Sequence, residues 1–317
     1  MNSKKRQKIV VIGGGTGAFT VLSGLRKFPV DLAVVVSMAD DGGSTGILRE
    51  EFGVLPPGDV RRALVALAHS DNRLLSRLFN YRFEEGGLKG HNFGNIMLAA
   101  LERVTGNFKD AVAEAGRILG IQGEVLPVTF DNVRLFAKLE DGTTIQGETN
   151  IDIPKHDGGL AITKIWLEPA AGANKDAIRA IRGADLVVIG PGDLYTSVLP
   201  NFLVKGISEA VCKSKGKKIY IANIMTKWGE THGFTAAHFV VSLEHYLGGK
   251  YIDYVLINTT RPSPERLRRY EKESAEFVTK GALTKNPKHI FGNFLRPRGF
   301  IRHDPETLAK TLVKLLE

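Results

Sequence analysis

Two patterns of apolar residues alternate along the chain. Residues 8–13 (KIVVIG) and 31–37 (DLAVVVS) are unbroken β-branched runs, which are typical of strands buried on both faces of a parallel sheet. Segments with apolar residues at helical spacing lie between such runs. Further strands are predicted at 124–129, 161–169, 185–192, 217–225 and 252–258, and helices at 18–28, 59–69, 71–81, 92–106, 107–120, 174–184, 231–248 and 305–316.

This order of elements predicts the α/β class, with a doubly wound, mostly parallel Rossmann-like sheet and helices on both faces. We expect a single domain over residues 1–317, because no low-complexity linker interrupts the chain. Residues 133–148 alternate around Asp141 and Gly142, and this pattern predicts a small β-hairpin inserted into the domain.

Composition narrows the class of protein. The 317 residues carry a formal net charge of +9, which favours anionic partners. Basic and aromatic residues do not alternate in a stripe, so we expect no nucleic acid partner. No apolar run reaches about 18 residues, so no membrane span is predicted. The single cysteine, Cys212, excludes a disulfide framework and is compatible with a reducing cytoplasm, and we predict a helix around it.

In a doubly wound sheet, ligands bind beyond the carboxyl ends of the strands, so the loops there are the first candidates for a site. The loop after the first strand, GGGTG (13–17), has the G-x-G-x-x-A spacing that Ala18 completes. Glycines in this position let backbone N–H groups approach a phosphate at a helix N-terminus. The residues predicted to bind a phosphate or nucleotide here are Gly13, Gly14, Gly15, Thr16 and Gly17.

The stretch after the second strand, residues 38–59, combines three carboxylates with several glycines. Its start is too rich in glycine for a helix, so we expect flexible, exposed backbone there. Three roles are open for Asp40 and Asp41: binding a ribose, coordinating Mg²⁺, or capping local turns. Asp59 is either a third metal ligand or the N-cap of the helix that follows. The remaining predicted site residues of this stretch are Gly42, Gly43 and Ser44.

Three later loops have a similar character. The predicted site residues in them are His91, Asn92 and Asn95, then Gly190, Pro191, Gly192, Asp193, Tyr195, Thr196 and Ser197, and finally Asn223 and Thr226. At Asn92, ordinary helix capping competes with a ligand contact, and a lone histidine such as His91 is as easily structural as functional. Taken together, the loops predict one elongated, polar cleft that accepts phosphate.

The longest of these motifs resemble one family. The segments GGGTG (13–17), DDGGSTGILREEFGVLPPGD (40–59), GHNFGN (90–95), GPGDLYTSVLPN (190–201) and NIMTKWGETHGFT (223–235) together resemble the CofD-like superfamily and, within it, the YvcK-type gluconeogenesis factors. The resemblance extends from about Lys8 to Asn258 and fades towards the C-terminus.

The resemblance implies two alternatives for function. YvcK-type members are bacterial cytoplasmic proteins that bind UDP-sugars and are linked to cell shape and envelope precursor metabolism, with no established reaction. CofD-type members are Mg²⁺-dependent transferases of 2-phospho-L-lactate that act on a nucleotide-activated donor. The form of residues 40–59 favours the YvcK type. The resemblance also implies that the predicted loops line the nucleotide site, with Asp40, Asp41 and Asp59 as candidates for Mg²⁺.

Two further expectations concern partners and chemistry. We expect a homodimer. A third class of protein, an NAD-dependent dehydrogenase, is disfavoured because no histidine–aspartate pair suited to hydride transfer is visible, and because dinucleotide binding does not require the acidic, glycine-rich stretch after the second strand.

Two positions depart from the usual pattern of the family. Asp193 stands where the resemblance implies a small hydroxyl-bearing residue, and KWGET (227–231) replaces QPGET. Each change alters the charge near the predicted phosphate loops. We expect Lys227 to offset the additional carboxylate at Asp193.

Overall fold

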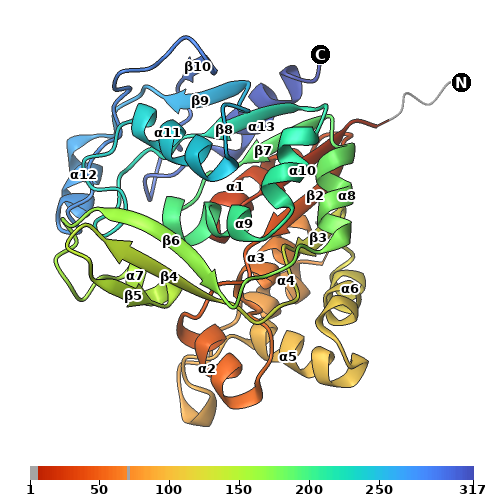
Figure 1. Ribbon diagram of the computed structural model, residues 1–317. Coiled ribbons are helices and arrows are strands. Elements are labelled where there is room, and N and C mark those ends of the chain that lie inside the picture. Colours follow the sequence, from red (N-terminus) through yellow and green to blue (C-terminus); the bar gives the residue numbers. More distant parts are fainter. Residues whose placement is uncertain (1–5, 70–71) are drawn as a thin grey trace, which may run out of the picture.

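The computed structural model describes residues 6–69 and 72–317. Its centre is a seven-stranded sheet in which all neighbouring strands are parallel (Figure 1). The strands are β1 (Lys8–Ile12), β2 (Asp31–Val36), β3 (Glu124–Pro127), β7 (Leu186–Ile189), β8 (Lys217–Ile221), β9 (Tyr254–Asn258) and β10 (Lys288–Gly292). Their order across the sheet is β10-β9-β8-β7-β1-β2-β3. The predicted doubly wound parallel sheet is confirmed, and β10 is a strand that the sequence pattern did not predict.

Helices cover both faces of this sheet, as predicted (Figure 1). On one face, α1 packs against both α3 and α13, and on the other face α10 contacts both α8 and α11. The bounds are α1 (Gly15–Leu25), α3 (Gly58–Leu67), α8 (Lys175–Gly183), α10 (Ile207–Lys213), α11 (Ala236–Leu247) and α13 (Pro305–Lys314). Cys212 lies on α10, as predicted. Because helices cover both faces, Ile9, Val11 and Ile12 of β1 are completely buried, which explains the unbroken apolar run.

Smaller elements extend this core. They are α2 (Gly43–Phe52), α4 (Arg73–Asn80), η1 (Gly86–Leu88), α5 (Phe93–Thr105), α6 (Phe108–Leu119), the π-helical turn η2 (Leu194–Val198), α9 (Pro200–Leu203) and α12 (Pro264–Glu271). The predicted helix at 71–81 corresponds to α4, although its expected first residue, Asp71, lies outside the described residues. In the part of the chain that the structure describes, no helix is long and apolar enough to cross a membrane.

The predicted hairpin is present and belongs to a larger unit. Its strands β4 (Arg134–Leu139) and β5 (Thr144–Gln146) pair antiparallel, and β6 (Ile162–Glu168) pairs with β4 on the other side. The strand predicted at 161–169 therefore belongs to this second, three-stranded sheet and not to the main one. The short helix α7 (Glu148–Asp152) follows β5. We call residues 134–168 the insertion.

Two local predictions are wrong. The stretch after β2 was expected to be a loop at its start, but α2 begins at Gly43, and Ser44 and Thr45 are buried. Glycine costs little at the first position of a helix, because that end has no preceding turn to stabilise. Asp59 does not cap α3: the helix begins one residue earlier, its N-cap is Pro57, and the Asp59 carboxylate accepts a hydrogen bond from the Gly15 N–H at 2.9 Å.

Candidate functional site

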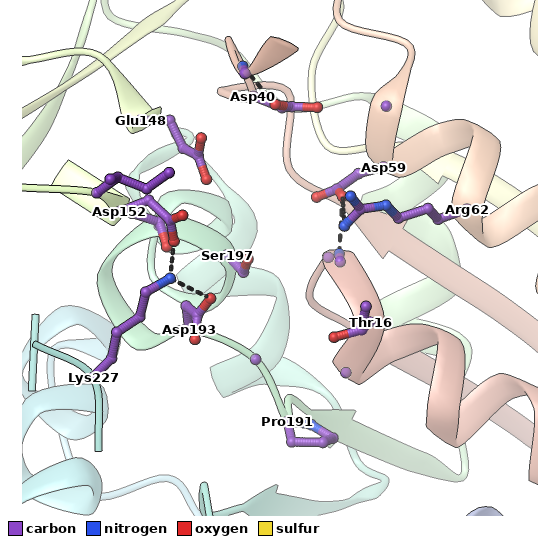
Figure 2. A pocket seen from close by; sticks show the side chains of 18 of the residues that line it. Thr16, Asp40, Asp59, Arg62, Glu148, Asp152, Pro191, Asp193, Ser197 and Lys227 are labelled. Carbon is purple, nitrogen blue, oxygen red and sulfur yellow. Dashed lines mark hydrogen bonds and ion pairs between the residues drawn. The ribbon is translucent and has the colours of Figure 1, made fainter. Parts of the chain in front are cut away.

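Four predicted loops meet because the strands that carry them are neighbours. The order β2-β1-β7-β8 places four carboxyl ends side by side at one edge of the sheet. A cavity of about 930 Å³ opens there, within the usual range for small-molecule sites (Figure 2). The predicted residues that line it are Gly14, Gly15, Thr16, Gly17, Asp40, Gly42, Gly43, Ser44, Asp59, Asn95, Pro191, Gly192, Asp193, Thr196, Ser197, Asn223 and Thr226.

The glycines of the first loop are required by close packing. Gly15 has φ of 60°, and a Cβ atom on Gly17 would overlap the backbone oxygen of Pro191. The loops after β1 and β7 therefore touch through their backbones. Helix α1 begins here, and its N-cap Gly14 provides no side-chain cap. The first turn of α1 thus presents backbone N–H groups and the positive end of the helix dipole to the cavity.

Six predicted residues lie outside the cavity wall, and most of them support it. Gly13 packs beneath the loop, where a Cβ atom would lie 3.7 Å from Gly190 Cα. Tyr195 is buried, and its backbone N–H donates to Glu230. Asn92 caps α5 by accepting from the Asn95 N–H, which confirms the capping alternative for this residue. The others are Asp41, His91 and Gly190.

His91 lies behind the cavity and not in its wall. Its Nδ1 is 3.4 Å from the Ser44 hydroxyl oxygen, and the same oxygen accepts from the Asn92 N–H at 3.1 Å. The segment before α5 therefore positions the start of α2. This arrangement gives His91 a supporting role for the part of α2 that faces the cavity.

Asp41 connects the main sheet to the insertion. Its carboxylate accepts from the backbone N–H groups of Glu148 and Thr149 at the start of α7, and it faces Arg134 at 3.9 Å. A carboxylate in this position caps the helix from outside the helical segment. The placement favours a structural role for Asp41.

We expect Asp41→Ala to lower the free energy of unfolding by about 1–2 kcal/mol, because two N–H groups of α7 lose their acceptor. Urea unfolding measures this loss. Affinity for a ligand of the cavity should stay within about twofold of the parent protein, because Asp41 does not line the cavity. A large loss of affinity with unchanged stability would instead place Asp41 in contact with the ligand.

Asp40 and Asp59 lie together in the cavity, and both are hard to ionise. The Asp40 carboxylate accepts from the Gly42 N–H and the Thr45 hydroxyl, each at 2.9 Å. Burial raises the pKa of Asp40. Burial, followed by repulsion from Asp40, raises the pKa of Asp59 to about 6. The positive charge of Arg62, which lies 4.0 Å from Asp59, therefore does not fully offset the burial of the two carboxylates and their mutual repulsion.

The insertion contributes a third carboxylate that sequence reasoning missed. Glu148 of α7 lines the cavity, and burial together with repulsion from nearby carboxylates, Asp40 foremost, raises its pKa to about 9. Glu148 therefore retains a proton at neutral pH. Nothing in the sequence pattern pointed to Glu148, because α7 follows a hairpin and not a strand of the main sheet.

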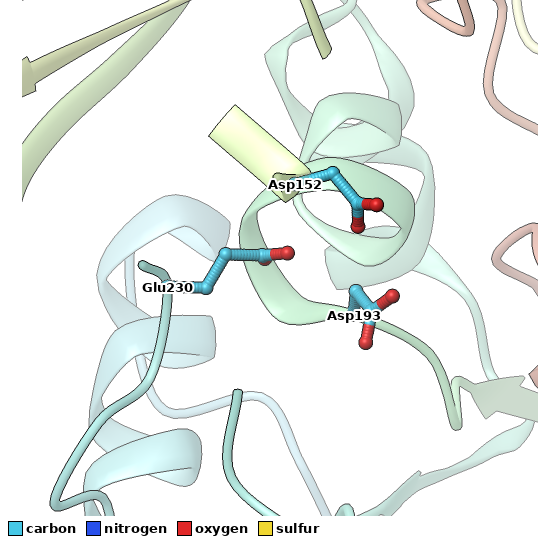
Figure 3. Close-up of side chains that lie close together, drawn as sticks. All are labelled: Asp152, Asp193 and Glu230. Atoms are coloured by element: carbon cyan, nitrogen blue, oxygen red, sulfur yellow. The ribbon is translucent and has the colours of Figure 1, made fainter. Parts of the chain in front are cut away.

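Lys227, Asp152 and Asp193 form the opposite part of the wall, and the buried Glu230 lies behind them. Lys227 Nζ lies 3.0 Å from Asp193 and 3.7 Å from Glu230, and it also contacts Asp152 of α7. Burial lowers the pKa of Lys227, but the charges of these three carboxylates outweigh that effect and raise it. The expectation that Lys227 offsets Asp193 is confirmed. Figure 3 shows the three carboxylates converging from three separate segments.

The three arginines Arg49, Arg61 and Arg62 have different roles. Arg61 is buried and donates to Asn95 at 3.0 Å and to Asn80 at 2.6 Å, so it holds α3, α4 and α5 together. Arg49 donates to the backbone oxygens of Asp40 and Val133. Arg62 alone of these three has a side chain that is 45% exposed, and it lines the cavity. It is therefore the arginine best placed to meet an anionic ligand.

The C-terminal part of the chain closes the remaining side of the cavity. Tyr270, Ile301, Arg302 and His303 line it there. His303 is only 6% exposed, and its Nε2 has no hydrogen-bond partner. Burial, partly offset by a hydrogen bond to the Ala222 backbone, lowers the pKa of His303 to about 4. Because the other ring nitrogen donates to Ala222, Nε2 is left as a buried acceptor without a partner. The sequence offered no signal for these residues.

The parallel sheet, its glycine loops and the cavity at their tips define a Rossmann-like α/β protein. Comparison with known proteins is more specific. The sequence model of the family described as 2-phospho-L-lactate transferase CofD matches residues 9–290. The chain is 41% identical over 319 residues to the gluconeogenesis factor of Bacillus subtilis, and this alignment covers 99% of each chain. It is 44% identical over 276 residues to that of Halalkalibacterium halodurans, covering 86% of this chain and 84% of the relative.

The solved structures agree with this result. A crystal structure of a UPF0052 family protein from Bacillus halodurans superposes with a TM-score of 0.92 at 39% identity, covering 98% of this chain and all of the other. The chain therefore belongs to the CofD-like superfamily and, within it, to the gluconeogenesis factor family.

Proposed function

We propose that this protein is a UDP-sugar-binding regulatory protein of the gluconeogenesis factor type, linked to cell shape and envelope precursor metabolism. The observation that carries the proposal is the convergence of two glycine-rich loops and the N-terminus of α1 on one cavity. Backbone N–H groups in such an arrangement suit a diphosphate, and Arg62 adds a positive charge beside them.

The nucleoside has a suitable compartment at the C-terminal side of the cavity. Ile224 and Ile301 supply apolar contact there, and the free acceptor on His303 Nε2 suits a ribose hydroxyl or a base N–H. Uracil carries such an N–H at its Watson–Crick edge, so UDP is compatible with this compartment. We further propose that the protein acts as a homodimer in the cytoplasm; its mass in solution tests the first part.

Mg²⁺ fits the carboxylates on the diphosphate side. Asp40 and Asp59 share the cavity and repel one another, and Asp59 has a carboxylate oxygen at the glycine loop. Oxygen ligands of this kind are the ones that Mg²⁺ prefers. We propose these two residues as its holders, where the ion would neutralise charge on the diphosphate. Asp41, whose carboxylate is engaged at α7, fits this role less well.

Calorimetric titration with UDP-N-acetylglucosamine tests the proposal, with GDP and NAD as comparison ligands. We expect saturable binding of the UDP-sugar, and Arg62→Gln to weaken it by about tenfold because a charged contact to phosphate is lost. The matched control is Arg179→Gln on α8, which lies outside the cavity. If the folded protein gives no heat at millimolar UDP-sugar, the proposal is wrong.

A transferase of the 2-phospho-L-lactate type is the alternative. The Asp40–Asp59 pair favours it, because a metal held there beside a diphosphate would stabilise the charge that develops during transfer. Mg²⁺-dependent release of a nucleoside monophosphate from an activated donor would support this alternative. Binding without any such release supports the regulatory role.

A further inference from the structure

The cavity has two walls of opposite chemical character. Figure 2 shows Thr16, Asp59 and Arg62 on one side, where the glycine loop and the N-terminus of α1 lie. We call the opposite side, made by Glu148, Asp152, Asp193 and Lys227, the acidic wall. On the first side the helix terminus and Arg62 favour an anionic group beside the Asp59 carboxylate, whereas the second side has two aspartates against one lysine.

The acidic wall carries more carboxylates than cations. Among the described residues, Lys227 is the ion-pair partner of both Asp152 and Asp193, and it also lies within 3.7 Å of the buried Glu230. In this wall one ammonium group therefore faces two aspartates. Each of the two aspartates is only partly buried and lines the cavity, and Lys227 contacts only one oxygen of each.

The position of the acidic wall relative to the other compartments indicates what occupies it. The proposed function puts the diphosphate at the glycine loops and the nucleoside on the side of His303, a residue of the cavity wall whose buried Nε2 has no hydrogen-bond partner. A ligand with a third part must place that part against the acidic wall. Carboxylates accept hydrogen bonds from sugar hydroxyls, and they repel a second anion.

Resting on the proposed function, we infer that the acidic wall is a sugar subsite that accepts uncharged, hydroxylated sugars and rejects sugars that carry a carboxylate. Asp152 and Asp193 are its specificity-determining residues. Lys227 limits the rejection, because it neutralises part of the charge on these aspartates. The two departures from the family pattern, Asp193 and Lys227, thus act together on ligand choice.

UDP-glucose and UDP-glucuronate form a matched pair of probes, because they differ only in a hydroxymethyl or carboxylate group at C6. Calorimetry with the full chain should show UDP-glucose binding about tenfold or more tightly than UDP-glucuronate. Asp152→Asn and Asp193→Asn should each reduce this ratio severalfold by improving the binding of UDP-glucuronate. Lys227→Met should increase the ratio.

The ratio is measured within one protein, so partial unfolding of a variant lowers the active fraction equally for both ligands. Asp141→Asn, the same substitution at the exposed turn of the hairpin, should leave the ratio unchanged. Equal affinity for both sugars in the parent protein overturns the inference, as does a ratio that Asp152→Asn, Asp193→Asn and Lys227→Met all leave unaltered. If neither UDP-sugar binds, the proposed function itself fails, and the inference fails with it.

Discussion

Gly17→Ala should destabilise the protein by about 3 kcal/mol or more and abolish measurable nucleotide binding. The methyl group would overlap the backbone oxygen of Pro191, and the nearest atoms beyond it are also backbone. A backbone neighbour cannot rotate away, so the loops after β1 and β7 must separate. Because both loops line the cavity where we propose that a diphosphate binds, the same movement removes the predicted anion contacts. Thermal unfolding and UDP-sugar titration measure the two effects.

Two further alanine variants make this prediction specific. Gly183→Ala on α8 has open space around the new methyl group and should change stability by no more than about 1 kcal/mol. Gly14→Ala would meet the side chain of Asp59, which can move, so we expect a folded protein with weakened nucleotide binding. Parent-like stability and affinity in Gly17→Ala would show that the two loops need not touch.

Glu148→Gln should stabilise the protein at pH 8 and have little effect at pH 5. The pKa of Glu148 is about 9 in the folded state against its ordinary 4.5, so the folded protein keeps a proton that the unfolded chain loses. Stability from this group is therefore complete below about pH 4.5 and declines as the pH rises towards 9. Glutamine does not titrate, so the stability of the variant does not fall with rising pH in the way that Glu148 makes the parent protein's stability fall.

The expected size of the effect is about 2 kcal/mol at pH 8, or a rise of roughly 5 °C in Tm. This free energy is well below the value that the full difference between the folded and unfolded pKa would give. The reason is that Glu148 is partly exposed to the cavity, where solvent screens its charge. Thermal unfolding of both proteins from pH 5 to pH 8 measures it. The exposed Glu51→Gln on α2 is the control and should follow the parent protein at every pH. Parallel pH profiles for Glu148→Gln and the parent would contradict the prediction.

Much of the site was predictable from local pattern. The β-branched runs at β1, β2 and β7 had to be buried on both faces, so helices on both sides of a parallel sheet followed. Glycine and hydroxyl-bearing residues after those strands then had to lie at one edge. The prediction failed at α2 and Asp59, where glycines and a carboxylate that suit local turns instead make contacts with distant residues.

The sequence by itself determined the class of fold, the loops that line the cavity and the family. Only the tertiary structure decided which charges face one another. Glu148 and Asp152 reach the cavity because the insertion folds back over the sheet edge, and His303 reaches it from the far end of the chain. The spacing of apolar residues along a helix or strand indicates which of its sides is buried. A pKa shift or an ion pair, in contrast, depends on distances between residues that are far apart in the sequence. Those distances exist only once the chain has folded.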